Sequence, residues 1–144
     1  MANQAANRAK YLLAQGDIDF TTHVFKIILM DDSFVFNRDT HHQYSDVIAH
    51  ELGAGFGYTA GGYTLLGIAV TENDVDNRTD ITWNNPTWAA VGGNIGPSSG
   101  AIIYDDTDAN DSIIGYIDFL ADYTQVDGGS VTLINISVRI KTVP

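Results

Sequence analysis

The chain has 144 residues, of which 44% are hydrophobic and 17% are charged, and it contains no cysteine. This composition is typical of one globular domain, residues 1–144, and it excludes disulfides and thiolate metal sites. Eighteen acidic residues against seven lysines and arginines give a formal net charge of −11, which argues against a nucleic-acid partner. Neither a signal segment nor a membrane span is expected, because the start of the sequence has no long apolar segment and no later run of 18 apolar residues occurs.

The charges are distributed unevenly along the sequence. Residues 39–138 hold 14 of the 18 acidic residues and a single base, Arg78. The other bases lie towards the two ends, at Arg8, Lys10, Lys26, Arg38, Arg139 and Lys141. An acidic surface commonly serves only to keep a protein in solution. The functional interpretation is that the terminal segments face a partner while the acidic body faces water.

The first segment predicts a short helix within an N-terminal arm, residues 1–16. Alanines and leucines fall near helical spacing over roughly residues 4–15, and Gly16 is a suitable C-terminal stop. A helix of this length is not stable alone, so it must pack against something. Leu12 and Leu13 are therefore candidate interface residues, either with the rest of the domain or with a neighbouring copy.

Beyond the helix, short apolar segments alternate with glycine-rich and aspartate-rich turns. The strands expected from them cover residues 23–30, 63–70, 79–83, 87–91, 100–105, 112–120 and 130–140. Residues 39–51 predict a loop with a short helical turn. A change of apolar phase near Ile134 and Asn135 is typical of a β-bulge. The whole pattern predicts a mainly β fold, an antiparallel β-sandwich or barrel of about seven to eight strands with a short N-terminal helix.

Motifs with catalytic or metal-binding spacing are not found in the sequence. His50 and Glu51 begin like the HExxH zinc motif, but Ala54 stands where the second histidine is needed. The aspartate-rich segments 72–76 and 105–111 lack the spacing of a calcium-binding loop. We therefore expect a protein that is not an enzyme, with no catalytic residue, no cofactor and no metal.

Two tryptophans, Trp83 and Trp88, bracket the turn at residues 84–86. Exposed tryptophans would suit a glycan-binding module, because their flat rings can stack on sugars. In a small β domain, however, tryptophans more often fill the core or a subunit interface. We favour core or interface, so these two residues join Leu12 and Leu13 as candidate interface residues.

Packing and turn motifs run from end to end of the sequence. In chain order they are NRAKYLLAQGDIDF, FKIILMDDSF, YSDVIAHEL, GYTAGGYTLLGIAV, ITWNNPTW, GAIIYDDT and IIGYIDFLADYT. Together they resemble a family of small virion-associated proteins encoded by many tailed bacteriophages. The motifs are not a catalytic signature, so no functional residue is carried over. The chain departs from the family pattern in a longer segment, residues 92–100, which we interpret as a contact loop.

This resemblance implies a structural protein of the phage virion, made in the host cytoplasm and placed on the capsid exterior. Capsid decoration, or cement, suits a small single domain without fibre repeats. The expected partners are the major capsid protein or other virion proteins, in a homo-oligomer that we expect to be a trimer, without nucleic acid or membrane. The N-terminal helix and the basic C-terminal strand are candidates for the shell side. The alternatives are a tail or fibre component, or a carbohydrate-binding module for the host surface.

Overall fold

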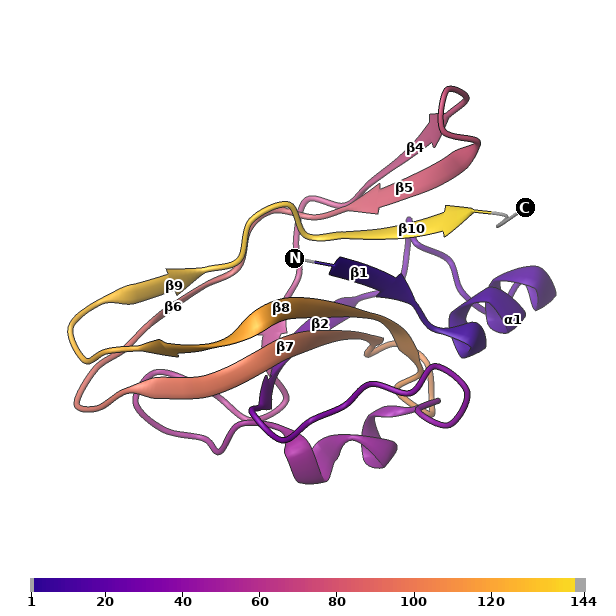
Figure 1. Ribbon diagram of the computed structural model, residues 1–144. Coiled ribbons are helices and arrows are strands. Elements are labelled where there is room, and N and C mark those ends of the chain that lie inside the picture. Colours follow the sequence, from indigo (N-terminus) through magenta and orange to yellow (C-terminus); the bar gives the residue numbers. More distant parts are fainter. Residues whose placement is uncertain (1, 142–144) are drawn as a thin grey trace.

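The computed structural model describes residues 2–141 and confirms the mainly β fold expected from the sequence. All strand pairs are antiparallel. The largest sheet has five strands in the order β1-β8-β7-β2-β3 (Figure 1). Their bounds, in that order, are Ala2–Ala5, Ile113–Gln125, Ile95–Asp105, Phe25–Asp31 and Tyr63–Thr64.

The remaining strands form a bent ribbon that lies across the large sheet. One part has the order β10-β5-β4, and the other pairs β6 with β9. Their bounds, from β4 in chain order, are Ala69–Asn73, Arg78–Thr82, Thr87–Ala89, Ser130–Thr132 and Ser137–Lys141. β5 leads into β6 and β9 leads into β10, so the two parts are continuous (Figure 1). The sheet and the ribbon together make a sandwich-like arrangement.

The ten described strands exceed the seven to eight expected, because two of the expected strands are broken and residues 2–5 add a further strand, β1. The last one is interrupted at residues 133–136, where Asn135 has a φ of 56°. The phase change in the sequence therefore marks a break between two strands rather than a bulge within one. The expected strand 63–70 is broken in the same way near Gly67, which has a φ of 67°.

The prediction of a contact loop at residues 92–100 is wrong for most of these residues. β7 begins at Ile95, which pairs with Gln125 of β8, and Ser98 pairs with Tyr123. Ile95 and Ser98 are both buried. Glycines and serines in this segment suggested a loop, but small residues here allow β7 to pair closely with β8. Only residues 92–94 remain as a turn.

The core lies between the large sheet and the ribbon and extends to the other face of the sheet. In β2, Ile27, Ile28, Leu29 and Met30 are at most 2% exposed, so consecutive side chains are buried on both faces. The segment 34–62 covers the face opposite the ribbon (Figure 1). This two-sided burial explains why the sequence of β2 is continuously apolar rather than alternating.

The N-terminal helix α1, Asn7–Gln15, begins later than expected because residues 2–5 pair with β8 as strand β1. It ends at Gly16, as the sequence predicts, with a left-handed φ of 80°. The Gly16 N–H donates to the Leu13 carbonyl at 3.1 Å, and the Asp17 N–H donates to the Leu12 carbonyl at 2.9 Å. These two bonds satisfy carbonyls at the end of the helix.

Two short 3-10 helices, Tyr44–Asp46 and Ile48–His50, occupy the segment where a helical turn was expected. No helix of the described chain is long and apolar enough to cross a membrane.

Leu12→Asp is expected to lower the free energy of unfolding by about 2–4 kcal/mol, measured by urea denaturation. Leu12 is 6% exposed and belongs to the core, so the change buries a charge and removes apolar contacts. Leu66 is 62% exposed, so Leu66→Asp is the matched control and should change stability by no more than about 0.5 kcal/mol. Equal losses from the two variants would contradict the packing of α1 on the sheet.

Candidate functional site

Three of the four candidate interface residues lie inside the domain. Leu12, Trp83 and Trp88 are 6%, 6% and 5% exposed, and Leu13 is partly buried against the core. The ring of Trp83 packs 5.6 Å from that of Phe25, measured between centroids. The four side chains therefore do not gather on one surface of the protein. Their role between copies stays a prediction, and the tryptophans do not present a stacking surface for sugars.

Two of the four histidines lie beside an aspartate, His23 beside Asp105 at 2.6 Å and His50 beside Asp31 at 3.3 Å. Among the described residues no group of three or more His, Cys, Asp or Glu side chains is placed to hold a metal ion. His50 does lie beside Asp31 and Ser33, but both contacts, each 3.3 Å, are made by the same ring nitrogen, Nδ1. A serine–histidine–aspartate relay needs both nitrogens of the imidazole, so this arrangement does not form one.

Glu51, the acidic residue of the incomplete zinc motif, anchors the glycine-rich loop instead. Its carboxylate accepts hydrogen bonds from the hydroxyl groups of Tyr44 and Tyr58, the latter at 2.7 Å, and from the Gly61 N–H at 2.8 Å. Burial and the charge of Glu51 raise the pKa of Tyr58, so this phenol stays protonated and can donate. Glu51 therefore has a structural role in fixing residues 53–62 against the sheet.

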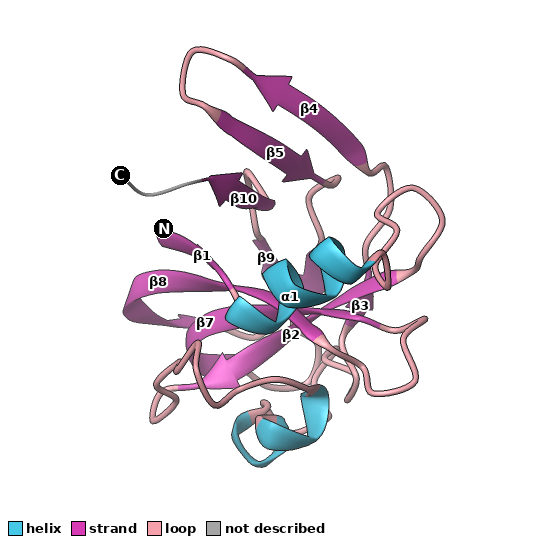
Figure 2. Ribbon diagram, turned by 90° about the vertical axis from the view of Figure 1, so that its right-hand side faces the viewer, coloured by secondary structure: helices cyan, strands magenta, loops and turns pink. Residues whose placement is uncertain are grey.

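The fold brings five of the seven bases to one place, between the first and last strands. Figure 2 shows β1 and β10 side by side, with β1 leading into α1. A hollow of about 220 Å³ lies at this seam. We call it the basic cleft, and its lining residues are Asn3, Gln4, Ala5, Lys10, Arg38, Arg78, Arg139 and Lys141.

Some of the cations in the basic cleft are held by neighbouring side chains. Arg78 lies 3.1 Å from Asp76 and 2.9 Å from Asp80, and Arg139 lies 3.4 Å from Asp80. Burial alone would raise the pKa of Asp80, but hydrogen bonds from Arg78 and Asn73 and the nearby guanidinium charges hold it below its usual value. The carboxylate of Asp80 therefore stays ionised, and its contacts, together with that of Asp76 to Arg78, keep the two arginines in place.

The other cations of the cleft have more freedom to meet a partner. Arg38 donates from Nη2 to the neutral Gln4 Oε1 at 2.8 Å and forms no ion pair with another described residue. Lys10 and Lys141 are exposed, and neither forms an ion pair within residues 2–141. The sequence placed Arg78 apart from the terminal bases, and its position in the cleft follows from the pairing of β5 with β10.

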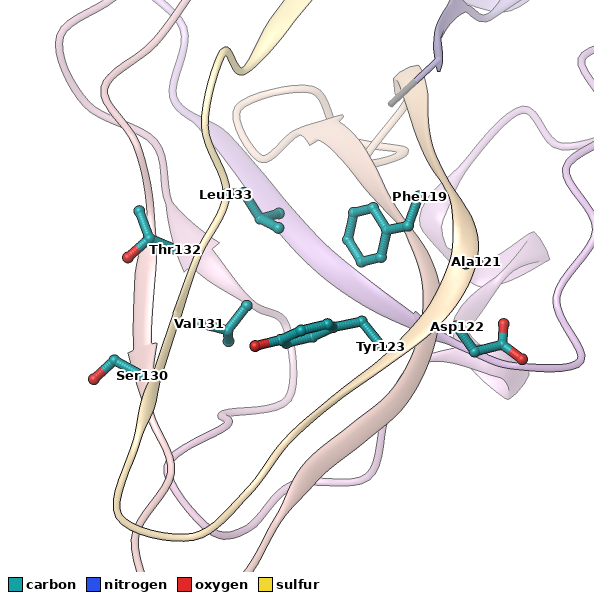
Figure 3. Close-up of a pocket in the computed structure, with 8 residues that line it drawn as sticks. All are labelled: Phe119, Ala121, Asp122, Tyr123, Ser130, Val131, Thr132 and Leu133. Carbon is teal, nitrogen blue, oxygen red and sulfur yellow. The ribbon is translucent and has the colours of Figure 1, made fainter.

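A second hollow, of about 500 Å³, lies between β8 and β9, and we call it the β8–β9 groove. Figure 3 shows the side chains of Phe119, Tyr123, Val131 and Leu133 pointing into the space between the two strands, whereas Asp122 points away from it. The groove also has Ala121, Ser130 and Thr132 in its lining. Sequence reasoning missed this groove because it depends on how β8 and β9 lie relative to each other.

Comparison with known proteins gives no match to a family model, to a curated protein or to a solved structure. The fold defines the chain as a mainly β, antiparallel protein.

Proposed function

We propose that this chain is a structural protein of a bacteriophage virion and that it decorates the capsid. The proposal joins the resemblance of its sequence motifs to small tailed-phage virion proteins with one structural observation. That observation is the basic cleft, which collects five of the seven bases on a chain with a net charge of −11. An uneven charge distribution of this kind orients a protein towards an oppositely charged surface.

A decoration protein needs one surface that matches the shell and a remainder that faces water. The basic cleft lies between β1 and β10, close to α1, which are the N-terminal and C-terminal elements expected on the shell side. We therefore propose that the cleft faces an acidic patch of the major capsid protein. A homo-oligomer, for which we favour a trimer, would place several such clefts around one symmetry axis.

The basic cleft places five cations together on one surface. Binding through the cleft should weaken measurably as the salt concentration rises, because exposed charges are screened.

The two alternative functions, a carbohydrate-binding module and a tail or fibre component, would bind through different surface features. A host-surface carbohydrate-binding module draws no support from Trp83 and Trp88, because both rings are buried in the core. A tail or fibre component could dock through the same basic cleft. Locating the protein on the head or the tail of purified virions therefore separates decoration from the tail alternative.

Lys10→Glu is expected to weaken binding to empty shells by roughly 3–10-fold at low salt, measured by co-sedimentation. The reversed charge would repel an acidic shell surface facing the cleft. Arg8→Glu is the matched control, since Arg8 lies on the same helix but does not line the cleft, where Lys10 does. Equal weakening by the two variants, or none by Lys10→Glu, would reject the cleft as the docking surface.

A further inference from the structure

The segment between β2 and the first 3-10 helix lies against the large sheet without forming a helix or strand. We call this segment, residues 34–42, the His41 loop. At one end the Phe34 N–H donates to the Asp31 carbonyl at 3.3 Å. At the other end the Ile113 N–H donates to the His42 carbonyl at 2.9 Å. The loop is therefore fixed at both ends, and the contacts of its middle part decide whether it stays on the sheet.

An aromatic cluster holds the His41 loop against β8. The imidazole of His41 stacks on the ring of Phe34 at 5.4 Å and lies 5.8 Å from that of Phe36, measured between centroids. Both phenylalanines in turn pack on Tyr116 of β8, at 5.7 and 5.1 Å. Phe34 is buried and Phe36 is partly buried against the core. The ring of His41 thus completes the packing that joins the loop to the sheet.

The hydrogen bond of His41 requires an uncharged imidazole. The Asn37 N–H donates to His41 Nδ1 at 3.1 Å. A backbone N–H can only donate, so Nδ1 must present its lone pair. In the charged imidazolium both ring nitrogens carry hydrogen, and neither can accept. Protonation of His41 therefore removes this bond and turns two N–H groups towards each other.

The other histidines make contacts that both charge states allow. His42 Nε2 lies 2.9 Å from the Asp39 carbonyl, which only accepts, so this ring nitrogen donates whether or not the ring is charged. His23 and His50 each lie beside an aspartate carboxylate, which a charged ring satisfies equally well. Among the described residues, the ring of His41 is thus the one imidazole whose hydrogen bond is lost on protonation.

The surroundings of His41 also favour its neutral form. Burial lowers the pKa of His41; the carboxylate of Asp46 on the first 3-10 helix opposes this effect, and the charges of His50 and His42 add to it. Burial raises the pKa of the Tyr116 phenol, so this group stays uncharged at acidic pH. Because the packed ring has the lower pKa, a released loop binds the proton more readily. Acid therefore shifts the equilibrium towards release as the pH falls below about 6.5.

From this geometry we propose that the His41 loop is an acid-sensitive strap, which leaves the large sheet when His41 gains a proton. The loop also carries Arg38, which donates to Gln4 of β1 and lines the basic cleft, and Asp39, which accepts from Asn7 of α1 at 2.6 Å. Release consequently takes one of the five cations out of the basic cleft. The release is a property of the isolated protein, so its test does not depend on the proposed function.

The test follows hydrogen exchange of the ¹⁵N-labelled full chain by NMR from about pH 7.5 to about pH 4.5, which spans the ordinary titration of histidine. After correction for intrinsic exchange rates, protection of the Asn37 and His41 amides is expected to fall at least about fivefold, in parallel with protonation of the His41 ring. Amides of β2 and β7 should keep their protection, which distinguishes local release from general unfolding. Unchanged protection in the loop, or a fall shared equally by the whole sheet, would overturn the proposal.

A matched pair of substitutions assigns the effect to one ring. In His41→Gln the side-chain oxygen can still accept from the Asn37 N–H, but the group does not titrate, so the acid-induced fall should disappear. His42→Gln replaces the neighbouring histidine, whose hydrogen bond does not require a neutral ring, and should leave the fall in place. Persistence of the fall in His41→Gln, or its loss in His42→Gln, would reject His41 as the group that releases the loop.

Discussion

Gly62→Ala is expected to lower the free energy of unfolding by about 3 kcal/mol or more, measured by urea denaturation. Gly62 has a φ of +82°, and a Cβ added there would lie 2.0 Å from the Ile27 carbonyl oxygen and 2.7 Å from its carbon. Ile27 is fully buried in the middle of β2, so its backbone cannot move aside without disturbing the sheet. Backbone strain and overpacking therefore act together at this position.

Gly128→Ala is the matched control for this change. Gly128 has nearly the same φ, +83°, but a Cβ there meets no atom within 4 Å. Its substitution should cost about 1 kcal/mol, which is the strain of the backbone conformation alone. Equal losses of the free energy of unfolding in the two variants would contradict the close packing of the loop 53–62 against β2.

The features that the sequence predicted correctly are those specified by neighbouring residues. The continuous apolar segment of β2 indicated a buried strand, and Gly16 marked the end of α1 because a left-handed residue closes a helix. The mainly β class followed from frequent turns between short apolar segments. These signals are local, so they could be read without knowing which strands pair.

The features that the sequence missed depend on contacts between distant segments. The glycines and serines of residues 95–100 suggested a loop, yet pairing with β8 makes them part of β7. The start of α1 was predicted too early, because residues 2–5 pair with β8 as a strand. Local propensity is a weak predictor where tertiary pairing decides the conformation.

The candidate interface residues and the basic cleft also differ in whether local sequence could predict them. Composition identified Trp83 and Trp88 as core or interface residues, and the structure buries both. The basic cleft, by contrast, joins Lys10, Arg78 and Lys141, which are far apart in the sequence. They lie close together because α1, β5 and β10 meet at one end of the sandwich. The order of charges along the sequence does not show this proximity.

The proposed capsid decoration predicts that phage particles lacking this protein assemble heads but release their genome more readily on heating or osmotic shock. A decoration protein that binds the closed shell adds its binding free energy to the resistance of the shell against internal pressure, because ligands of the native state stabilise it. Restoring the wild-type protein should restore heat resistance. Protein carrying Lys10→Glu should restore it less completely than protein carrying Arg8→Glu, because only Lys10 lines the basic cleft.

The most direct test of the proposed capsid decoration deletes the gene for this chain and compares purified particles before and after heating. We predict intact heads at low temperature and earlier loss of DNA from the deleted particles, measured by dye access to the released genome. Intact heads that keep their DNA as well as wild type but fail to adsorb to the host would contradict capsid decoration. That result would favour the tail, fibre or glycan-binding alternative.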